Sequence, residues 1–131
     1  MTAEPLHARV SVKGVLVDPD GRVLVLRDES GWELPGGRLG VEEAPETGLR
    51  REVREETGQS VRVDGPVDAV AWHNGAGEGR FAVVYACPTG ETTVRLSDEH
   101  EASAWLGPDP ARERLPDRFA QAVGRARRNE R

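Results

Sequence analysis

Three carboxylates that lie close together in the sequence, Glu52, Glu55 and Glu56, are the side chains best spaced for chemistry. If this segment is helical, positions i, i+3 and i+4 share one face, so the side chains fall within roughly a 100° arc. Carboxylate oxygens are hard ligands suited to Mg²⁺ or Mn²⁺, and Mg²⁺ usually keeps room for water and substrate phosphate. The spacing therefore predicts a site that binds a divalent cation and a phosphorylated ligand together.

An ordinary solvated surface helix is the competing interpretation, because Arg51 can pair with Glu55 at i+4. The glutamates, however, fall in the last two turns of a helix expected to end at Thr57 or Gly58. Negative charge there opposes the helix dipole by roughly 0.3 to 1 kcal/mol per group. Repulsion between the carboxylates adds to this cost and raises their pKa values. A helix shaped only by stability would carry Lys or Arg at these places, so the pattern favours a cation site.

The segment from residue 37 to 59 resembles the Nudix box, G-x5-E-x7-R-E-U-x-E-E-x-G-U, in which U is a bulky aliphatic residue. Eight fixed positions match in order, and they are Gly37, Glu43, Arg51, Glu52, Val53, Glu55, Glu56 and Gly58. The last position departs from the pattern, because Gln59 replaces the aliphatic residue. That change bears on the local packing more than on the chemistry. The preceding residues 32–37, WELPGG, also resemble the usual entry to the box.

The resemblance implies a set of metal ligands and catalytic groups. The implied ligands of Mg²⁺ or Mn²⁺ are Glu52, Glu55, Glu56 and the backbone carbonyl of Gly37. Arg51 is expected to orient a catalytic glutamate, and Glu43 to steady the loop and helix. The general base has two candidates: Glu99, in the downstream SDEH segment, or one of Glu55 and Glu56 acting through a metal-bound water.

The activity that the resemblance implies is divalent-metal-dependent hydrolysis of the diphosphate linkage of a nucleoside diphosphate derivative. Its substrate would be a (d)NTP, ADP-ribose or a nucleotide sugar. The alternative is a non-catalytic nucleotide-binding sensor domain with the Nudix fold, which the retention of every box carboxylate argues against. A homodimer is compatible with the resemblance.

Composition is that of one globular domain, residues 1–131, with 37% hydrophobic and 31% charged residues. The net charge of −5 argues against binding to a nucleic-acid polymer. No apolar run reaches roughly 18 residues, and we expect neither a membrane span nor a signal-peptide core. The single cysteine, Cys87, cannot form an internal disulfide. A cytoplasmic location is the expectation that follows.

Apolar patterns and turn residues predict strands on both sides of one helix. The hairpin is expected at 10–17 and 23–26, and the box helix from Pro45, with Leu49 and Val53 buried. Further strands are expected at the end of 28–34, within 61–72 with an irregularity at Gly65-Pro66, and at 81–86, 92–96 and 102–106. Prolines 108, 110 and 116 are expected to interrupt the chain before a terminal helix at 117–128.

This order of elements predicts an α/β protein with a mixed sheet covered on both faces. The resemblance makes the topology definite: the Nudix fold, an α/β/α sandwich over roughly residues 8–128. Among the other side chains, Trp32 has the aromatic position closest to the expected cleft. His73 and His100 stand isolated in the sequence, and we expect neither to bind metal or to titrate.

Overall fold

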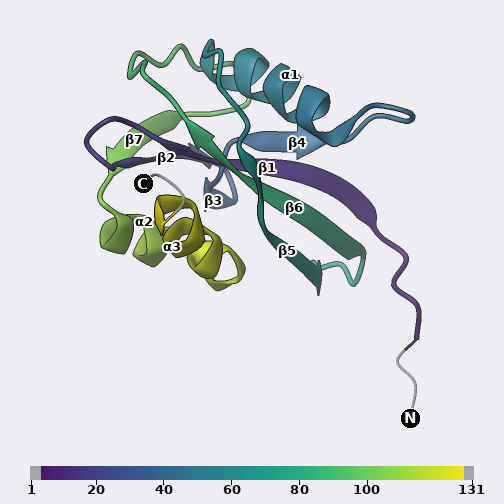
Figure 1. The fold of residues 1–131 in the computed structure, drawn as a ribbon. Helices are drawn as coiled ribbons and strands as arrows, with labels where there is room; N and C mark the ends of the chain where they lie inside the picture. Colours follow the sequence, from purple (N-terminus) through teal and green to yellow (C-terminus); the bar gives the residue numbers. More distant parts are fainter. Residues whose placement is uncertain (1–3, 129–131) are drawn as a thin grey trace.

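A mixed sheet of seven strands forms the centre of the computed structural model, which describes residues 4–128 (Figure 1). The predicted domain also contains residues 1–3 and 129–131, which lie outside the described residues. Five strands form a continuous path in the order β3-β2-β1-β6-β5, while β4 pairs with β1 and β7 with β2. Their bounds are β1 Arg9–Val17, β2 Val23–Asp28, β3 Gly31–Glu33, β4 Gly36–Arg38, β5 Gly65–His73, β6 Gly79–Pro88 and β7 Ala102–Leu106. Only the β1–β6 pair is parallel among these strands.

The predicted hairpin between β1 and β2 is confirmed, with Val17 opposite Val23. Its turn is held by the buried carboxylate of Asp18, which accepts hydrogen bonds from the backbone N–H groups of Asp20 (2.9 Å) and Arg22 (2.8 Å). Such a side chain replaces the missing backbone partners of a tight turn. The register of β2 against β1 is therefore fixed locally.

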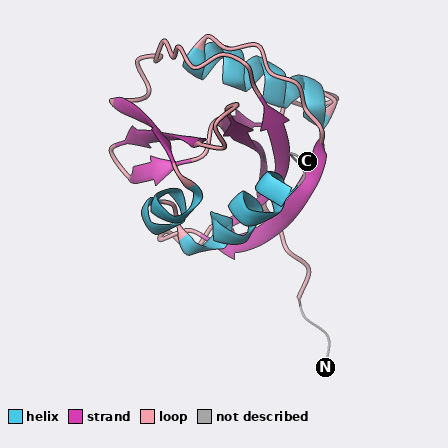
Figure 2. Ribbon diagram, turned by 60° about the vertical axis from the view of Figure 1, so that its left-hand side comes forward, coloured by secondary structure: helices cyan, strands magenta, loops and turns pink. Residues whose placement is uncertain are grey.

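Helices cover both faces of the sheet, as predicted (Figure 1). Helix α1 (Pro45–Thr57) lies on one face, while α2 (Pro108–Arg114), the 3₁₀ turn η1 (Asp117–Phe119) and α3 (Ala120–Arg128) lie on the other. Figure 2 shows the strands between these two layers. Alternate residues of a strand point to opposite faces: Val15 packs in the cluster with α2 and α3, and Leu16 in the cluster with α1. Two apolar faces explain why β1 and β2 lack the alternation of a half-exposed strand.

Helix α1 has the predicted bounds and the predicted buried stripe. It begins at Pro45, where a missing N–H costs nothing, and it is followed by Gly58 in the left-handed region at φ 75°. The N–H of Gly58 donates to the carbonyl of Arg54 at 2.9 Å. Leu49 and Val53 are fully buried. Packing of this stripe on β1 fixes which face of the helix carries the glutamates.

The C-terminal third differs from the sequence prediction in two places. Residues 92–96 do not form a strand, because their backbone is hydrogen-bonded to side chains and to the end of α1. Pro108 and Pro110 do not interrupt the chain; they begin helix α2, since the first helical turn needs no N–H donors. The predicted helix at 117–128 starts as the 3₁₀ turn η1 and becomes α-helical at Ala120.

The remaining predictions of elements agree with the structure. Residues 65–73 form the one strand of the 61–72 region, with a register shift between Pro66 and Asp68. Residues 102–106 form β7 as predicted, and β3 lies within 28–34. Within residues 4–128 the longest helix, α1, has 13 residues, and none is long and apolar enough to span a bilayer.

Candidate active site

Two consecutive glycines in β4 bring the backbone against the carboxylates of α1. Gly36 has φ 142°, and a Cβ there would overlap the carbonyl of Val12. Its N–H donates to Oε1 of Glu56 at 2.7 Å in a buried hydrogen bond. A Cβ on Gly37 would collide with the carboxylate of Glu52. The sequence Gly36-Gly37 is therefore required for close approach, and the Gly37 backbone lies directly beside Glu52.

Arg51 binds three carboxylates of the box and fixes the loop before α1. Its Nε and Nη2 donate to the two oxygens of Glu43 at 2.8 and 3.0 Å, a bidentate pair. Its Nη1 donates to Glu52 at 3.0 Å and to Glu55 at 3.3 Å. Glu43 also accepts the N–H of Gly40 at 2.9 Å. The Arg51 and Gly40 donors lower the pKa of Glu43 to about 2, so this carboxylate stays ionised as the anchor of the arginine.

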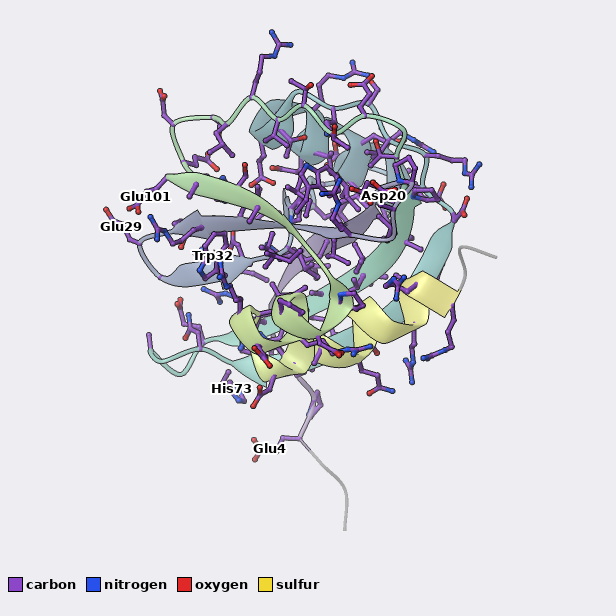
Figure 3. The ribbon with its side chains drawn as sticks, turned by 90° about the vertical axis from the view of Figure 1, so that its left-hand side faces the viewer. Glu4, Asp20, Glu29, Trp32, His73 and Glu101 are labelled. Carbon is purple, nitrogen blue, oxygen red and sulfur yellow. The ribbon has the colours of Figure 1, made fainter. Side chains whose placement is uncertain are left out.

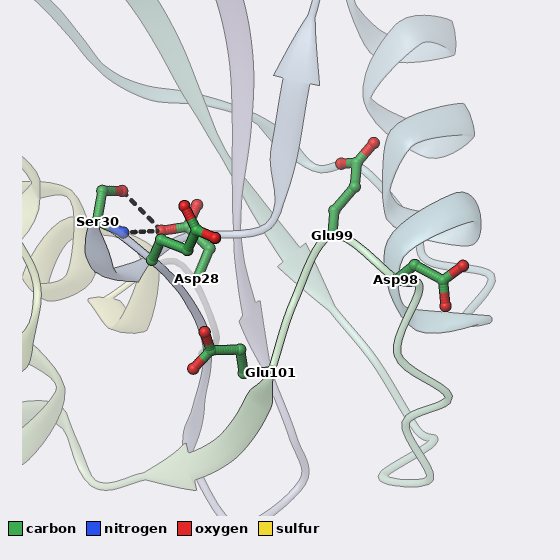
Figure 4. Close-up of a pocket in the computed structure, with 6 residues that line it drawn as sticks. Asp28, Ser30, Asp98, Glu99 and Glu101 are labelled. Carbon is green, nitrogen blue, oxygen red and sulfur yellow. Dashed lines mark hydrogen bonds between the residues drawn. The ribbon is translucent and has the colours of Figure 1, made fainter.

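The predicted residues Gly37, Glu52, Glu56 and Glu99 line one cavity of about 540 Å³. The other residues of its wall are Ser11, Lys13, Asp28, Glu33, Gly36 and Arg38. A neighbouring hollow of about 510 Å³ shares Asp28 and Glu99 with it and is otherwise lined by Glu29, Ser30, Asp98 and Glu101 (Figure 4). Figure 3 shows Glu29 and Glu101 at the same end of the molecule, after β2 and before β7. Glutamates and aspartates thus dominate one end of the combined space.

Glu99 enters the cavity from the loop that precedes β7. In Figure 4 its side chain extends toward β4 and α1, the elements that carry Gly37, Glu52 and Glu56. Residue Glu99 is exposed, and within residues 4–128 no hydrogen bond or ion pair holds its carboxylate. The position of Glu99 is therefore set by the backbone of its loop.

Glu56 is the buried acid of the site, with its side chain 5% exposed. Burial raises its pKa to about 7, and the nearby Glu33 acts in the same direction, while the Gly36 N–H, Lys13 and His100 oppose the shift. An ionised carboxylate is costly in such a place unless positive charge compensates it. Lys13, the sole lysine of the chain, lines the same cavity as Glu56. Its ammonium group donates a hydrogen bond to the Leu34 carbonyl at 3.3 Å.

His100 is not isolated, contrary to the sequence expectation. Its Nε2 lies 3.1 Å from Oε1 of Glu33 and 3.8 Å from Oε2 of Glu56. Oxygen or nitrogen atoms of Asp28, Glu33 and His100 all lie within 4.8 Å of one another. These partners are far from His100 in the sequence, so no local pattern could have identified them.

Glu55 shares the Nη1 of Arg51 with Glu52 but does not line the cavity. Its side chain is 57% exposed and pairs with Arg51, and it is not among the residues that line the 540 Å³ cavity. Its role as a ligand or base stays a prediction. Trp32 likewise is absent from that wall; its ring lies near the guanidinium groups of Arg27 (5.6 Å) and Arg114 (5.2 Å).

Sequence reasoning missed Lys13, Asp28 and Glu33 as residues of the cavity wall. Lys13 carried one signal, because a lone lysine interrupts the otherwise apolar second half of β1. The sequence offered Arg38 as one of three arginines that could bind phosphate, with a solvated surface position as the favoured interpretation. Asp28 ends β2 and Glu33 ends β3, and neither residue had a pattern of its own.

The donor set fits a hard divalent cation. Glu52 retains its Oε2 beside Gly37, since its Oε1 accepts the hydrogen bond from Arg51. Glu56 is buried and retains Oε2, because Oε1 takes the Gly36 N–H. Carboxylate and carbonyl oxygens are the ligands that Mg²⁺ and Mn²⁺ prefer. A cation here would also relieve the cost of keeping Glu56 ionised.

The fold and the site together define a class: an α/β/α sandwich in which a diglycine strand faces the glutamates of one helix. The family model described as NUDIX domain matches residues 7–126, and the chain belongs to this family. The protein is thus a Nudix hydrolase, and the enzyme class predicted from the box, a pyrophosphatase, is confirmed.

Relatives and solved structures agree with this assignment. A MutT-like protein of Streptomyces ambofaciens is 44% identical over 91% of this chain and 76% of its own length. A CTP pyrophosphohydrolase of Escherichia coli strain K12 is 30% identical over 78% of each chain. The crystal structure of a MutT protein from Methanosarcina mazei Go1 superposes with a TM-score of 0.81 at 26% identity, covering 98% of this chain and 100% of that one.

Proposed function

We propose that the protein is a divalent-metal-dependent nucleoside triphosphate pyrophosphohydrolase. The observation that carries the proposal is the convergence of Glu52, Glu56 and Glu99 with the Gly37 backbone on one cavity. These groups come from three separate elements, and a solvated surface helix would give no reason for them to meet. Among the substrates that the box leaves open, we choose nucleoside triphosphates because two relatives are named MutT-like protein and CTP pyrophosphohydrolase.

The distribution of charge in the cavity supports a polyphosphate substrate. Lys13 and Arg38 lie in the same wall as the carboxylates. A phosphate chain can therefore meet these cations while bound Mg²⁺ or Mn²⁺ meets the glutamates. The adjoining hollow carries Asp28, Glu29, Asp98, Glu99 and Glu101, which repel phosphate. We infer that the phosphates lie at the Lys13 end of the combined space.

The protein's own groups then have distinct roles. Glu52, Glu56 and the Gly37 carbonyl would hold the cation, which supplies positive charge against the charge that develops on the phosphoryl oxygens. Arg51 holds Glu52 in place through the Glu43 anchor. Glu99 would take the proton from the attacking water, because it is the cavity carboxylate that no other side chain within residues 4–128 binds. Lys13 and Arg38 would orient the phosphates.

The test is turnover of a substrate panel with Mg²⁺ or Mn²⁺ by the wild type and by Glu56→Gln. The panel contains CTP, the other (d)NTPs, 8-oxo-dGTP, ADP-ribose, nucleotide sugars and dinucleoside polyphosphates, with separate detection of phosphate, pyrophosphate and nucleoside monophosphate. We expect metal-dependent release of pyrophosphate from a nucleoside triphosphate, lost at least roughly 100-fold in the variant. Turnover restricted to ADP-ribose or nucleotide sugars would show that nucleoside triphosphates are not the substrate class. Binding of nucleotides without turnover would favour the sensor function.

A further inference from the structure

Gln59 occupies the last position of the box, where the family pattern has an aliphatic residue, and it is fully buried. Its Nε2 donates to the carbonyls of Glu91 and Thr93, both at 3.1 Å. Its Oε1 accepts the hydroxyl of Thr89 at 3.5 Å. Burying an amide without partners is costly, and here both amide hydrogens are used. Through these hydrogen bonds, the Gln59 side chain links the end of α1 to residues 89–93.

The segment that Gln59 binds is held by donors from other elements in place of a strand partner. The indole N–H of Trp105 donates to the carbonyl of Thr92 at 2.9 Å, between the two carbonyls that Gln59 binds. The N–H groups of Arg95 and Ser97 donate to the carbonyls of Thr57 (2.9 Å) and Glu56 (3.2 Å). The last carbonyls of a helix have no partner within it, so this segment satisfies the C-terminal end of α1. The position of residues 91–97 is therefore fixed relative to the end of helix α1.

Glu99 lies two residues beyond this anchored segment. After it, His100 bonds Glu33, and the Glu101 N–H donates to the carbonyl of Arg27 at 2.8 Å. Because the Glu99 carboxylate has no bond of its own within residues 4–128, these backbone anchors determine where it lies relative to Glu56. Among the anchors before Glu99, Gln59 alone binds two carbonyls at once.

We propose that Gln59 is a positioning residue that fixes Glu99 against the metal-binding glutamates of α1. Gln59 touches neither the cavity nor the reacting atoms; it acts through the segment 91–97. The inference rests on the proposed function, because it takes Glu99 as the group that accepts the proton. An aliphatic side chain at this position would fill the space but leave the carbonyl of Thr93 without its donor.

The test is a double-mutant cycle with Gln59→Met, which keeps the length of the side chain and removes its donors. We expect Gln59→Met to lower kcat roughly 10-fold with KM changed less than about 3-fold, because small displacements of a catalytic group have large effects on rate. In a Glu99→Gln background the same substitution is expected to lower kcat less than about 2-fold. An equal loss in both backgrounds, or no loss in the wild-type background, would overturn the proposal.

Two further variants separate positioning from general destabilisation. Val123→Ala removes buried volume in α3, on the opposite face of the sheet, and its kcat should stay at the wild-type value despite a lower Tm. Trp105→Phe removes the donor to Thr92 and should reproduce the kcat loss and its dependence on Glu99; it also provides the test if Gln59→Met does not fold.

Amide hydrogen exchange gives a readout independent of activity. Gln59→Met should speed exchange at residues 95 and 97 and leave the middle of α1 protected. A loosened segment with unchanged kcat would overturn this inference alone. If the wild type turns over no member of the panel, or if Glu99→Gln is as active as the wild type, the proposed function or its base fails, and the inference fails with it.

Discussion

A single buried carboxylate, Glu56, carries the electrostatic cost of this site. Its carboxylate accepts one backbone N–H and lies 3.8 Å from the His100 ring, yet burial still raises its pKa to about 7. In the folded protein, burial therefore favours the protonated form of the Glu56 carboxyl group. The same burial makes Glu56 a strong candidate ligand. A bound cation would offset the cost of ionising the buried carboxylate and would be coordinated by its oxygen.

The metal-free protein should therefore lose stability as the pH rises from about 4.5, the ordinary pKa of Glu56, to about 7. Between these values the folded state binds more protons than the unfolded state, so the free energy of unfolding falls with increasing pH. Glu56→Gln removes this dependence. We expect the variant, in EDTA, to melt roughly 5 °C above the wild type at pH 8 and close to it at pH 4.5. Thermal melts across this range measure it; a wild type that gains stability from this group over the same interval would contradict the shift.

Glu43 acts on the site through Arg51, since it touches no other carboxylate of the box. Glu43→Gln replaces one of the two carboxylate oxygens that accept hydrogen bonds from Arg51. Arg51 is then held less firmly and can move away from Glu52. Partners of this kind typically change metal affinity or activity by roughly 10- to 100-fold. We expect a loss of that size in kcat/KM, measured at saturating and limiting Mg²⁺. Glu46→Gln, which breaks only the exposed pair with Arg50, serves as the control and should retain wild-type activity.

Among the elements, the short strand β4 requires glycine at two consecutive residues, Gly36 and Gly37. It pairs with β1, with Gly36 opposite Lys13 and Gly37 opposite Val12, and it delivers a backbone N–H to Glu56. Both properties depend on a residue without a Cβ. Helix α1 is less constrained, because its stripe of Leu49 and Val53 needs only apolar side chains of suitable size.

Gly36→Ala should destabilise the fold by more than about 2 kcal/mol, because the new Cβ meets the Val12 carbonyl at a positive φ. Gly65→Ala is a matched control: Gly65 has φ 135°, but a Cβ there meets nothing within 4 Å. We expect the control to lose clearly less stability. Urea denaturation of both variants measures the difference, and equal losses would mean that backbone conformation, and not the contact with Val12, sets the requirement.

At the scale of the whole molecule, the sheet holds the box helix α1 on one face and the α2–α3 layer on the other. The cavity lies where β4, the end of α1 and the loop before β7 meet. A ligand that binds only this assembled geometry stabilises the folded state. Cation binding should therefore be visible in global unfolding.

Mg²⁺ or Mn²⁺ at roughly 100 times its Kd should add about 2.7 kcal/mol to the free energy of unfolding at pH 8. The gain should disappear in the Glu52→Gln/Glu56→Gln double variant, which lacks both proposed ligands. Chemical denaturation with and without the metal measures the gain. An unchanged gain in the double variant would place the cation elsewhere, for example among Asp28, Glu33 and His100.

The sequence by itself determined the box helix, its glutamate face, the hairpin and the covered sheet, because apolar periodicity, turn residues and capping glycine are local signals. The fixed spacing of the box also identified Gly37, Glu52 and Glu56, which the structure brings to one cavity. The path of residues 91–97 could not be predicted from the sequence. Its backbone is hydrogen-bonded to Gln59, to Trp105 and to the end of α1, and not to a neighbouring strand. Only the tertiary structure placed Lys13 and His100 beside the glutamates and turned Glu56, and not Glu55, into the interior. These outcomes depend on contacts between residues far apart in the chain, or on which of several adjacent carboxylates the packing turns inward, and no local pattern encodes either.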